Sequence, residues 1–261
     1  MEVVICASAE GIGRLGAAAV TELVARRPEA VLGLATGSSP RPVYAEVLRR
    51  VRDGQVDLGR VSTFSLDEYV GLPADHPSSY RAEIRRVFTD PAGIPAERVH
   101  TPRADEDDVE AAAAAYEEAI RTAGGIDLQL VGLGTEGHIA FNEPGSSLAS
   151  RTRIKTLTEQ TRQDNARFFD GDVSAVPHHC LTVGLATILD TRHVIVIATG
   201  ESKARAVAEL VEGAVSARWP ATVLQAHPHV TVLLDEAAAS GLELADYYRY
   251  AWEHKPGWQG L

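Results

Sequence analysis

The stretch IDLQLVGLG, residues 126–134, decides how this chain is expected to fold. It is a nearly continuous apolar run that ends in glycines, which is typical of a strand buried on both faces of a sheet. Similar short runs are VVICA (3–7), AVLGLA (30–35), RVSTFSL (60–66), HVIVIAT (193–199) and HVTVLLD (229–235). Longer segments with helical spacing lie between them, and this alternation predicts a parallel sheet covered by helices.

The predicted fold class is therefore α/β, a doubly wound, Rossmann-like fold whose mostly parallel sheet of about six strands has helices on both faces. The expected helices are GIGRLGAAAVTELVARR, RPVYAEVLRRVRDG, SSYRAEIRRVF, DEDDVEAAAAAYEEAIRTAGG and GESKARAVAELVEG. HHCLTVGLATILD (178–190) is also expected to be helical. No linker rich in Gly, Ser or Pro, no charge block and no internal repeat interrupts the pattern, so we expect one domain over residues 1–261.

The composition narrows the classes of partner. The 261 residues carry a net charge of -11, which argues against nucleic acid or an anionic membrane as the main partner. A local positive pocket for an anionic small molecule remains compatible with that charge. The apolar runs are far shorter than a membrane-spanning helix and no signal peptide is visible, so we expect a cytoplasmic protein. Cys6 and Cys180 lie in apolar runs far apart in sequence, which favours buried thiols over a disulfide.

Candidate site residues are those that follow the strands, because such sheets bind ligands beyond the carboxyl ends of their strands. TGSSP (36–40) is a turn of small residues before a helix, which favours phosphate binding by backbone N–H groups, although a plain turn has the same composition. Asp67 follows the next strand and is either a cap or a functional carboxylate. Lys203 begins a helix, where a cation opposes the helix dipole. A nearby anion explains that position, and a solvated lysine is the alternative.

The loop VGLGTEGHIAFNEP (131–144) continues from the strand predicted at residues 126–134. Its glycines have the G-x-G-x-x-G spacing of a dinucleotide loop, but the loop also contains Glu136, His138 and Glu143. These side chains are compatible with a metal site, an acid–base group or a structural network. The absence of H-x-x-x-H or C-x-x-C spacing argues against a metal, while carboxylates beside an imidazole favour acid–base chemistry. Together the four strand ends predict an enzyme that acts on a phosphorylated small molecule.

Five segments resemble the glucosamine-6-phosphate deaminase family, in order, from about residue 30 to about residue 235. They are LATGSSP, FSLDEYVGL, GLGTEGHIAFNEPGSSLASRTRIKTLT, RFFDGDVSAVPHHCLTVG and GESKARA. The combination of GHIAFNEP with LDEYVGL is highly specific. The resemblance implies that glucosamine 6-phosphate and water are converted to fructose 6-phosphate and ammonia, in amino-sugar (N-acetylglucosamine) catabolism, with no metal and no organic cofactor.

The resemblance also implies a role for each catalytic candidate. Asp67 matches the base that moves a proton from C2 to C1 of the substrate. His138 matches the residue that opens the sugar ring by moving a proton between the anomeric hydroxyl and the ring oxygen, and Glu143 matches the carboxylate that completes its network. Glu136 departs from the Asp or Asn of relatives, and its additional methylene means that the contact with the imidazole must adjust.

The substrate phosphate is implied to bind at two kinds of group. The backbone of Gly37, Ser38 and Ser39 matches the family's phosphate loop, and Arg167 and Lys203 match its cations. An arginine grips phosphate in a bidentate fork, whereas a lysine acts as a point charge.

A second, regulatory site is implied at Ser146, Ser147, Arg153 and Lys155. These residues match positions at which some family members bind N-acetylglucosamine 6-phosphate as an activator between the subunits of a hexamer. The resemblance thus implies a homo-oligomer. The alternative is a basic loop edge, since monomeric, unregulated relatives exist.

Three other functions are alternatives. A 6-phosphogluconolactonase shares the fold and a G-x-x-G-H turn, but its turn lacks FNEP and ester hydrolysis needs no base at C2. A sugar-phosphate sensor would need a DNA-binding helix-turn-helix, whereas Met1 leads directly into a strand and the net charge is -11. A sister enzyme for galactosamine 6-phosphate stays open, because no motif identifies the contacts that read the sugar hydroxyls.

Overall fold

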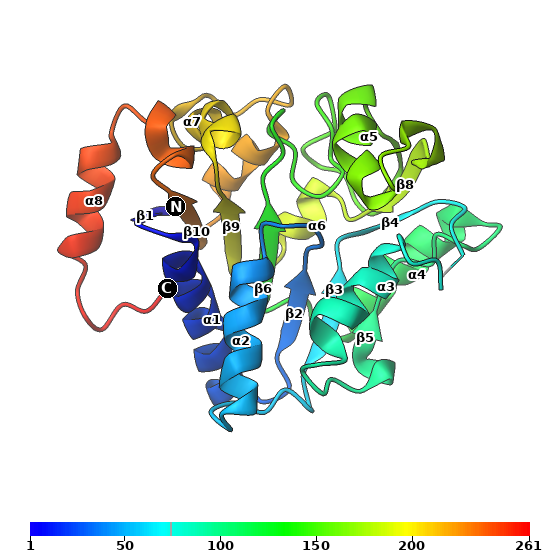
Figure 1. Cartoon of the computed structure of the whole chain (residues 1–261), viewed down its shortest axis with the longest axis horizontal. Coiled ribbons are helices and arrows are strands. Elements are labelled where there is room, and N and C mark those ends of the chain that lie inside the picture. The colour runs from blue at the N-terminus through cyan, green and yellow to red at the C-terminus, as the bar shows by residue number, and fades with distance from the viewer. Residues whose placement is uncertain (74) are drawn as a thin grey trace.

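The computed structural model describes residues 1–73 and 75–261, and at its centre lies a sheet of seven strands in the order β1-β10-β9-β6-β2-β3-β5 (Figure 1). All neighbouring strands are parallel. The strands are β1 (Glu2–Cys6), β2 (Val31–Leu34), β3 (Ser62–Ser65), β5 (Val99–His100), β6 (Leu128–Gly132), β9 (Val194–Ala198) and β10 (Val230–Asp235). The predicted fold class and the six predicted strands are confirmed, while the two-residue β5 is too short to give a sequence pattern.

Helices cover both faces of this sheet, with α1 and α2 in front of it in Figure 1. The helices are α1 (Ala9–Arg26), α2 (Arg41–Arg52), α3 (Tyr80–Ile84), α4 (Val109–Thr122), α5 (Glu159–Asn165), α6 (Leu185–Leu189), α7 (Ala204–Glu212) and α8 (Ala245–Glu253). A π-helical turn, Arg85–Thr89, continues α3, and 3₁₀ turns are Ala96–Arg98, Ala166–Phe168, Val173–Ala175, Glu201–Lys203, Pro220–Ala226 and Ala238–Gly241.

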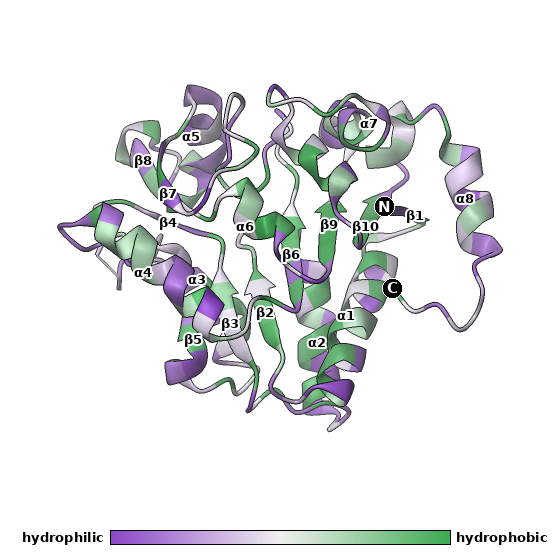
Figure 2. Cartoon of the chain, turned by 180° about the vertical axis from the view of Figure 1, so that it is seen from behind, coloured by the Kyte–Doolittle hydropathy of each residue, from purple (hydrophilic) through white to green (hydrophobic). Residues whose placement is uncertain are grey.

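Successive residues of the central strands enter two separate hydrophobic cores. On β9, Val194 and Val196 pack with α4, α6 and α7, whereas Ile195 and Ile197 pack with α1 and α2. Each fully buried aliphatic side chain stabilises the fold by about 1.5–3 kcal/mol. Because side chains alternate across a strand, burial on both faces requires uninterrupted apolar runs, which Figure 2 shows as green strands.

A second, three-stranded antiparallel sheet lies beyond the carboxyl end of the first, with the order β4-β8-β7. Its strands are β4 (Asp67–Tyr69), β7 (Arg153–Thr156) and β8 (His179–Thr182). The prediction of a helix over residues 178–190 was wrong, because the first part forms β8 and only α6 is helical. The strand pairs with segments far away in sequence, and this tertiary pairing overrides the local helical spacing.

Two smaller predictions can be compared with the structure. Cys6 and Cys180 are buried free thiols, as expected. Within residues 1–73 and 75–261, no helix has both the length and the apolar character needed to cross a bilayer.

The four segments that the sequence singled out follow four adjacent strands, β9, β6, β2 and β3. Parallel strands end at the same edge, so these segments meet at the upper edge of the sheet in Figure 1. Helix α5 and the second sheet lie above the same edge (Figure 1).

Candidate active site

A pocket at this edge brings together residues from all four strand ends. Its walls include Gly37, Ser38, Ser39, Asp67, His138, Arg167 and Lys203. The predicted phosphate-binding residues and two of the predicted catalytic residues therefore share one pocket. Glu143 stands behind His138, and Glu136 lies in the same loop.

The phosphate loop begins where β2 ends. Gly37 has φ of +86°, a left-handed conformation that glycine adopts without strain. Pro40 precedes α2 and makes no side-chain cap bond to it, the N–H of Arg41 donates to the Ser38 carbonyl at 3.3 Å, and Pro42 has no N–H. The backbone of the turn before α2 and the positive end of the helix dipole favour an anion at this position.

Two cations face the same region. Lys203 ends the 3₁₀ turn Glu201–Lys203 and directly precedes α7. The sequence predicted it within the first turn of that helix, whereas it lies just before the helix. Burial lowers the pKa of Lys203, Asp164 opposes that shift and Arg167 adds to it. The Arg167 guanidinium lies over the Phe168 ring at 4.8 Å from its centroid. A phosphate in the pocket gives both cations a charge partner.

Asp67 is the first residue of β4, where its Cα pairs with Thr182 of β8, so the second sheet holds it in place. Its side chain is buried, and burial raises the pKa of this carboxyl well above its usual value. The acidic neighbours Glu68 and Glu83 raise it further. A carboxylate with a raised pKa is a stronger base than one in water, as general base catalysis near neutral pH requires.

Glu68 fixes the backbone on which Asp67 stands. Its carboxylate accepts hydrogen bonds from the backbone N–H groups of Tyr69 (2.8 Å), Tyr80 (3.0 Å) and Arg81 (2.8 Å). These bonds tie β4 to the start of α3. No pattern in the sequence assigns Glu68 a role, because its partners in α3 belong to a separate segment.

His138 forms a pair with Glu143. The imidazole Nδ1 lies 3.1 Å from Oε2 of Glu143, whose side chain is only 2% exposed. Burial raises the pKa of Glu143, but the adjacent His138, the Thr161 side chain and the Thr158 backbone N–H together outweigh burial and lower that pKa. A carboxylate next to Nδ1 favours the neutral tautomer that is protonated there, and this tautomer leaves Nε2 as the atom that can take up a proton.

The glycines of the catalytic loop make room for aromatic rings. A Cβ at position 134 would lie 2.2 Å from Nε2 of His138, and one at position 137 would lie 2.5 Å from the ring of Trp219. Gly137 also has φ of +75°. The G-x-G-x-x-G spacing therefore accommodates an imidazole and an indole rather than a dinucleotide.

The segment 217–221, distant in sequence, forms hydrogen bonds with this loop. The N–H of Ala221 donates to the carbonyl of Gly137, and the N–H of Gly145 donates to the carbonyl of Ala217, both at 2.8 Å. Trp219 lies between these two contacts in sequence and is buried. No motif in the sequence predicts these contacts, because they join backbone groups that are 84 and 72 residues apart.

Glu136 differs from the other catalytic candidates. Its hydrogen-bond partner is Oγ1 of Thr158 at 3.5 Å, a long contact, whereas the imidazole pairs with Glu143. Thr158 is the N-cap of α5. The expected adjustment of the longer side chain thus takes the form of a contact with the segment above the pocket.

That segment supplies pocket residues that the sequence did not identify. Thr161, Asn165 and Phe168 line the pocket. Asn165 Nδ2 donates to the hydroxyl of Tyr69 at 2.9 Å, which ties the segment to β4. Only Arg167 had been singled out there, because it matches a cation of the deaminase family, whereas no motif marked the threonine, the amide or the phenylalanine.

The regulatory candidates lie at the edge of the second sheet and in the turn before it. Arg153 and Lys155 are on the same side of β7, because side chains alternate along a strand. Arg153 Nη1 donates to Oδ1 of Asn142 at 2.9 Å, next to Glu143 in the catalytic loop. Ser146 is buried and Ser147 is exposed.

The pocket thus combines an anion-binding wall with a proton-transfer wall. The first consists of the phosphate loop, Lys203 and Arg167, and the second of Asp67 and His138. Within the described residues, no group of three or more His, Cys, Asp or Glu side chains is arranged to hold a metal ion. The arrangement suits a reaction that moves protons on a phosphorylated substrate.

Known proteins resemble this chain over nearly all of its length. Residues 7–233 match the family described as glucosamine-6-phosphate isomerases/6-phosphogluconolactonase. A glucosamine-6-phosphate deaminase from Mycolicibacterium smegmatis is 62% identical over 261 residues, which is 100% of both chains. A solved monomeric glucosamine-6-phosphate deaminase is 40% identical, with a TM-score of 0.90 over 92% of this chain and 100% of that chain. A 6-phosphogluconolactonase from Trypanosoma brucei, 22% identical over 92% of this chain and 98% of its own, shares the fold with a TM-score of 0.74. The chain belongs to the family of glucosamine-6-phosphate isomerases and 6-phosphogluconolactonases, and within it to the glucosamine-6-phosphate deaminases.

Proposed function

We infer that this protein is a glucosamine-6-phosphate deaminase, which converts glucosamine 6-phosphate and water to fructose 6-phosphate and ammonia. Its similarity to deaminases over the whole chain supports the assignment. The observation in the structure that carries it is that one pocket is lined both by the anion-binding groups and by Asp67 and His138. A sugar phosphate has its charge at C6 and its reacting atoms at C1 and C2, so its two ends match the two walls.

Ring opening is the first step of this proposal. The anomeric hydroxyl loses a proton and the ring oxygen gains one, which frees the C1 aldehyde. Nε2 of His138 accepts and returns that proton, while Glu143 holds Nδ1 at 3.1 Å and stabilises the transient imidazolium. The role of Glu143 is therefore to fix the tautomer and orientation of the ring.

Isomerisation follows at Asp67. Its carboxylate removes the C2 proton of the open chain and delivers a proton to C1, while a second proton passes from the amine nitrogen to the C1 oxygen, so that the C2–N bond becomes an imine. Water adds to C2 and ammonia leaves, which produces the ketose. The raised pKa of Asp67 makes it a stronger base in the free enzyme, and the cations of the phosphate wall hold the substrate in place while the proton moves.

The assay that tests this function compares substrates side by side with no metal added. We expect equimolar ammonia and fructose 6-phosphate from glucosamine 6-phosphate, and slower turnover of galactosamine 6-phosphate. Hydrolysis of 6-phosphogluconolactone at a higher kcat/KM than deamination contradicts the proposal, since the lactonases share the fold. The galactosamine arm decides between the two amino-sugar phosphates that the sequence motifs leave open.

Regulation and assembly are further parts of the proposal. We propose a homo-oligomer, with a hexamer as its regulated form, activated by N-acetylglucosamine 6-phosphate near Arg153 and Lys155. The contact of Arg153 with Asn142 supports it, because it connects the strand to the catalytic loop. Since one solved relative is described as monomeric, the test is the mass in solution together with velocities with and without the activator. A monomer whose velocity is unchanged by the activator contradicts the proposed regulation and assembly but not the proposed deaminase activity.

We also propose a single domain over residues 1–261 and a location in the cytoplasm. A single domain predicts one cooperative unfolding transition with coincident optical and calorimetric midpoints. Two separated transitions contradict it.

A further inference from the structure

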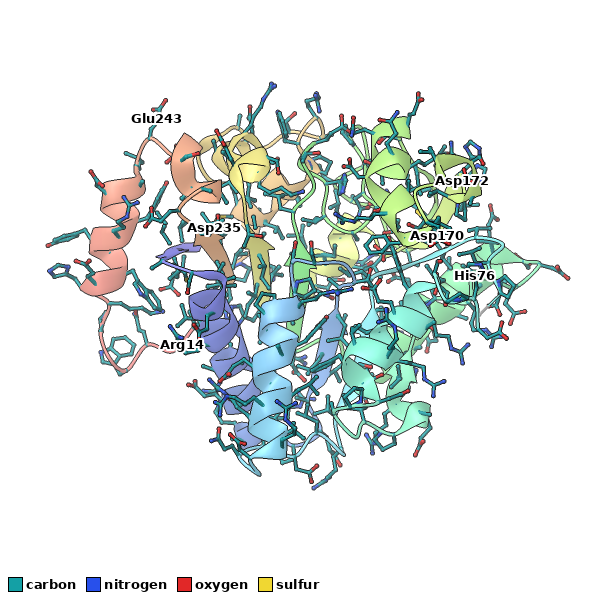
Figure 3. All side chains as sticks on the ribbon, viewed as in Figure 1. Arg14, His76, Asp170, Asp172, Asp235 and Glu243 are labelled. Atoms are coloured by element: carbon teal, nitrogen blue, oxygen red, sulfur yellow. The ribbon has the colours of Figure 1, made fainter. Side chains whose placement is uncertain are left out.

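We propose that Asp235, the last residue of β10, is a positioning residue for the substrate phosphate: it holds the turn that directs Lys203 into the pocket. Asp235 lies outside the set of residues that line the pocket and beyond the segment 7–233 that matches the family. Figure 3 labels it on the ribbon of β10. The proposal rests on the function proposed above, in which Lys203 binds phosphate.

The carboxylate of Asp235 joins the turns that follow two adjacent strands. Both of its oxygens accept the N–H of Gly200, at 3.0 Å each, just after β9. Its Oδ1 also accepts the N–H of Ala238, at 2.7 Å, just after β10. Hydrogen bonds to an ionised carboxylate are stronger than bonds between neutral groups, so one half-buried side chain connects the two turns.

Gly200 transmits this contact to the lysine. Its φ of 88° and ψ of 151° belong to a region that is essentially restricted to glycine. The N–H of Gly200 is held by Asp235, and its carbonyl accepts the N–H of Lys203 at 3.0 Å. Because both polar groups that flank its Cα are bonded, the conformations of the turn are restricted, and with them the position of the Cα of Lys203.

The second turn supports the other side of Lys203. Gly241 packs against the residue that follows the lysine, since a Cβ at position 241 would lie 2.9 Å from the carbonyl oxygen of Ala204. Asp235 caps the segment that leads to this contact by its bond to Ala238. The carboxylate therefore constrains the backbone both before and after Lys203.

A fixed backbone lowers the entropy cost of binding phosphate through a flexible lysine side chain. That side chain has four rotatable bonds, and freezing them on a phosphate costs conformational entropy. A backbone that already points the chain into the pocket lowers that cost, whereas a mobile turn adds to it. Loss of Asp235 is thus expected to weaken phosphate binding without changing the proton-transfer groups, which lie after β3 and β6.

The test compares Asp235→Ala and Asp235→Asn with the wild type. For Asp235→Ala we expect KM for glucosamine 6-phosphate and the inhibition constant of inorganic phosphate to rise together by about tenfold, the size of one charge-assisted hydrogen bond, with kcat changed by less than about twofold. Asp235→Asn keeps one acceptor oxygen, so a smaller rise in the same direction is expected. It also provides the comparison if Asp235→Ala does not fold.

A double-mutant cycle with Lys203→Met identifies the route of the effect. In the Lys203→Met background, replacement of Asp235 is expected to change KM by less than about twofold, since no lysine is left to position. The matched control is Asp127→Asn, another aspartate that accepts a backbone N–H, from Val31 at 2.8 Å, at the opposite edge of the sheet. It is expected to lower the thermal midpoint and leave KM unchanged.

Two results overturn the proposal: an unchanged KM in both folded Asp235 variants, or an equal rise of KM with and without Lys203. Failure of the proposed function is a separate result, since the wild type then makes no ammonia from glucosamine 6-phosphate. Calorimetric binding of inorganic phosphate to the same variants still measures the effect of Asp235 in that case.

Discussion

Two buried aspartates at opposite edges of the central sheet have opposite surroundings. Asp127 precedes β6 at the amino edge, where Arg27 Nη1 donates to it at 2.7 Å and Arg192 Nη1 at 3.0 Å. Its other oxygen accepts the N–H of Val31 at 2.8 Å. All of its charge is compensated, and it ties two strands and two loops together.

Asp67 follows β3 at the carboxyl edge and is buried to a similar extent, 7% exposed against 4% for Asp127. Burial raises its pKa, and its charged neighbours are the carboxylates of Glu68 and Glu83 rather than arginines. The contrast indicates that the aspartate at the amino edge stabilises the fold. The aspartate at the carboxyl edge has a raised pKa that costs stability and suits a general base.

The largest expected effect is the loss of activity in Asp67→Asn. We expect kcat to fall by about 10³-fold or more, since an amide of the same shape cannot accept the C2 proton. Ammonia release by equal amounts of folded variant and wild type measures it. If Asp127→Asn loses as much activity as Asp67→Asn, the division of roles between the two edges is wrong.

Asp127→Ala is expected to lose stability while it keeps its activity, the reverse of the effect of Asp67→Asn. Removing the carboxylate leaves the buried N–H of Val31 without its acceptor and leaves Arg27 and Arg192 without their shared ion-pair partner. The free energy of unfolding is therefore expected to fall by about 2–4 kcal/mol. Urea denaturation measures the loss. Activity at a temperature at which the variant stays folded is expected to match the wild type within about twofold, and stability equal to the wild type contradicts the comparison.

The pH dependence of stability sharpens the contrast. In the unfolded chain Asp67 titrates near its ordinary value of 3.8, and in the folded chain its pKa is well above that value. Between the two values the folded state keeps a proton that the unfolded state releases, so the stability of the wild type falls as pH rises through this window. Asp67→Asn lacks that titration.

The stability advantage of Asp67→Asn over the wild type is therefore expected to grow as pH rises through the window between the two pKa values and then to level off. Denaturation curves of both proteins from about pH 5 to about pH 8 provide the measurement. An advantage that shrinks as pH rises shows that the folded protein prefers the ionised carboxylate, which contradicts a raised pKa for Asp67.

Glu136→Asp is expected to have the smallest effect. The carboxylate of Glu136 contacts Thr158 at 3.5 Å while Glu143 holds the imidazole, so shortening it by one methylene leaves the pair with His138 intact. Turnover is expected to change by less than about threefold, which corresponds to one weak hydrogen bond. A rise much larger than this shows that the wild-type glutamate is a handicap for catalysis.

The site could be located from the sequence because its residues follow strands that are buried on both faces. Such strands are uninterrupted apolar runs, and the polar residues after each of them are conspicuous. Asp67, His138 and Lys203 could therefore be assigned to one edge of the sheet from the sequence alone. Their chemical roles followed from the resemblance to the deaminases rather than from the spacing.

What the sequence could not predict depends on contacts between distant segments. The strand β8 pairs with β4 and β7, which lie far away in sequence, and its own residues have a helical spacing. Asp235 and Gly200 are 35 residues apart, and Asp127 and Arg27 are 100 apart. An aspartate that binds a backbone N–H has no sequence pattern of its own, so its function is visible only in three dimensions.

The central claim is that the Asp67 carboxylate removes the proton at C2, and isotope exchange at that carbon tests it most directly. Glucosamine 6-phosphate deuterated at C2 is incubated with the wild type and with Asp67→Asn, and the deuterium remaining on C2 is followed by NMR. We expect the wild type to remove the label in step with ammonia release, and the variant to leave it on C2 even after prolonged incubation. Loss of the label at the wild-type rate from folded Asp67→Asn contradicts the claim.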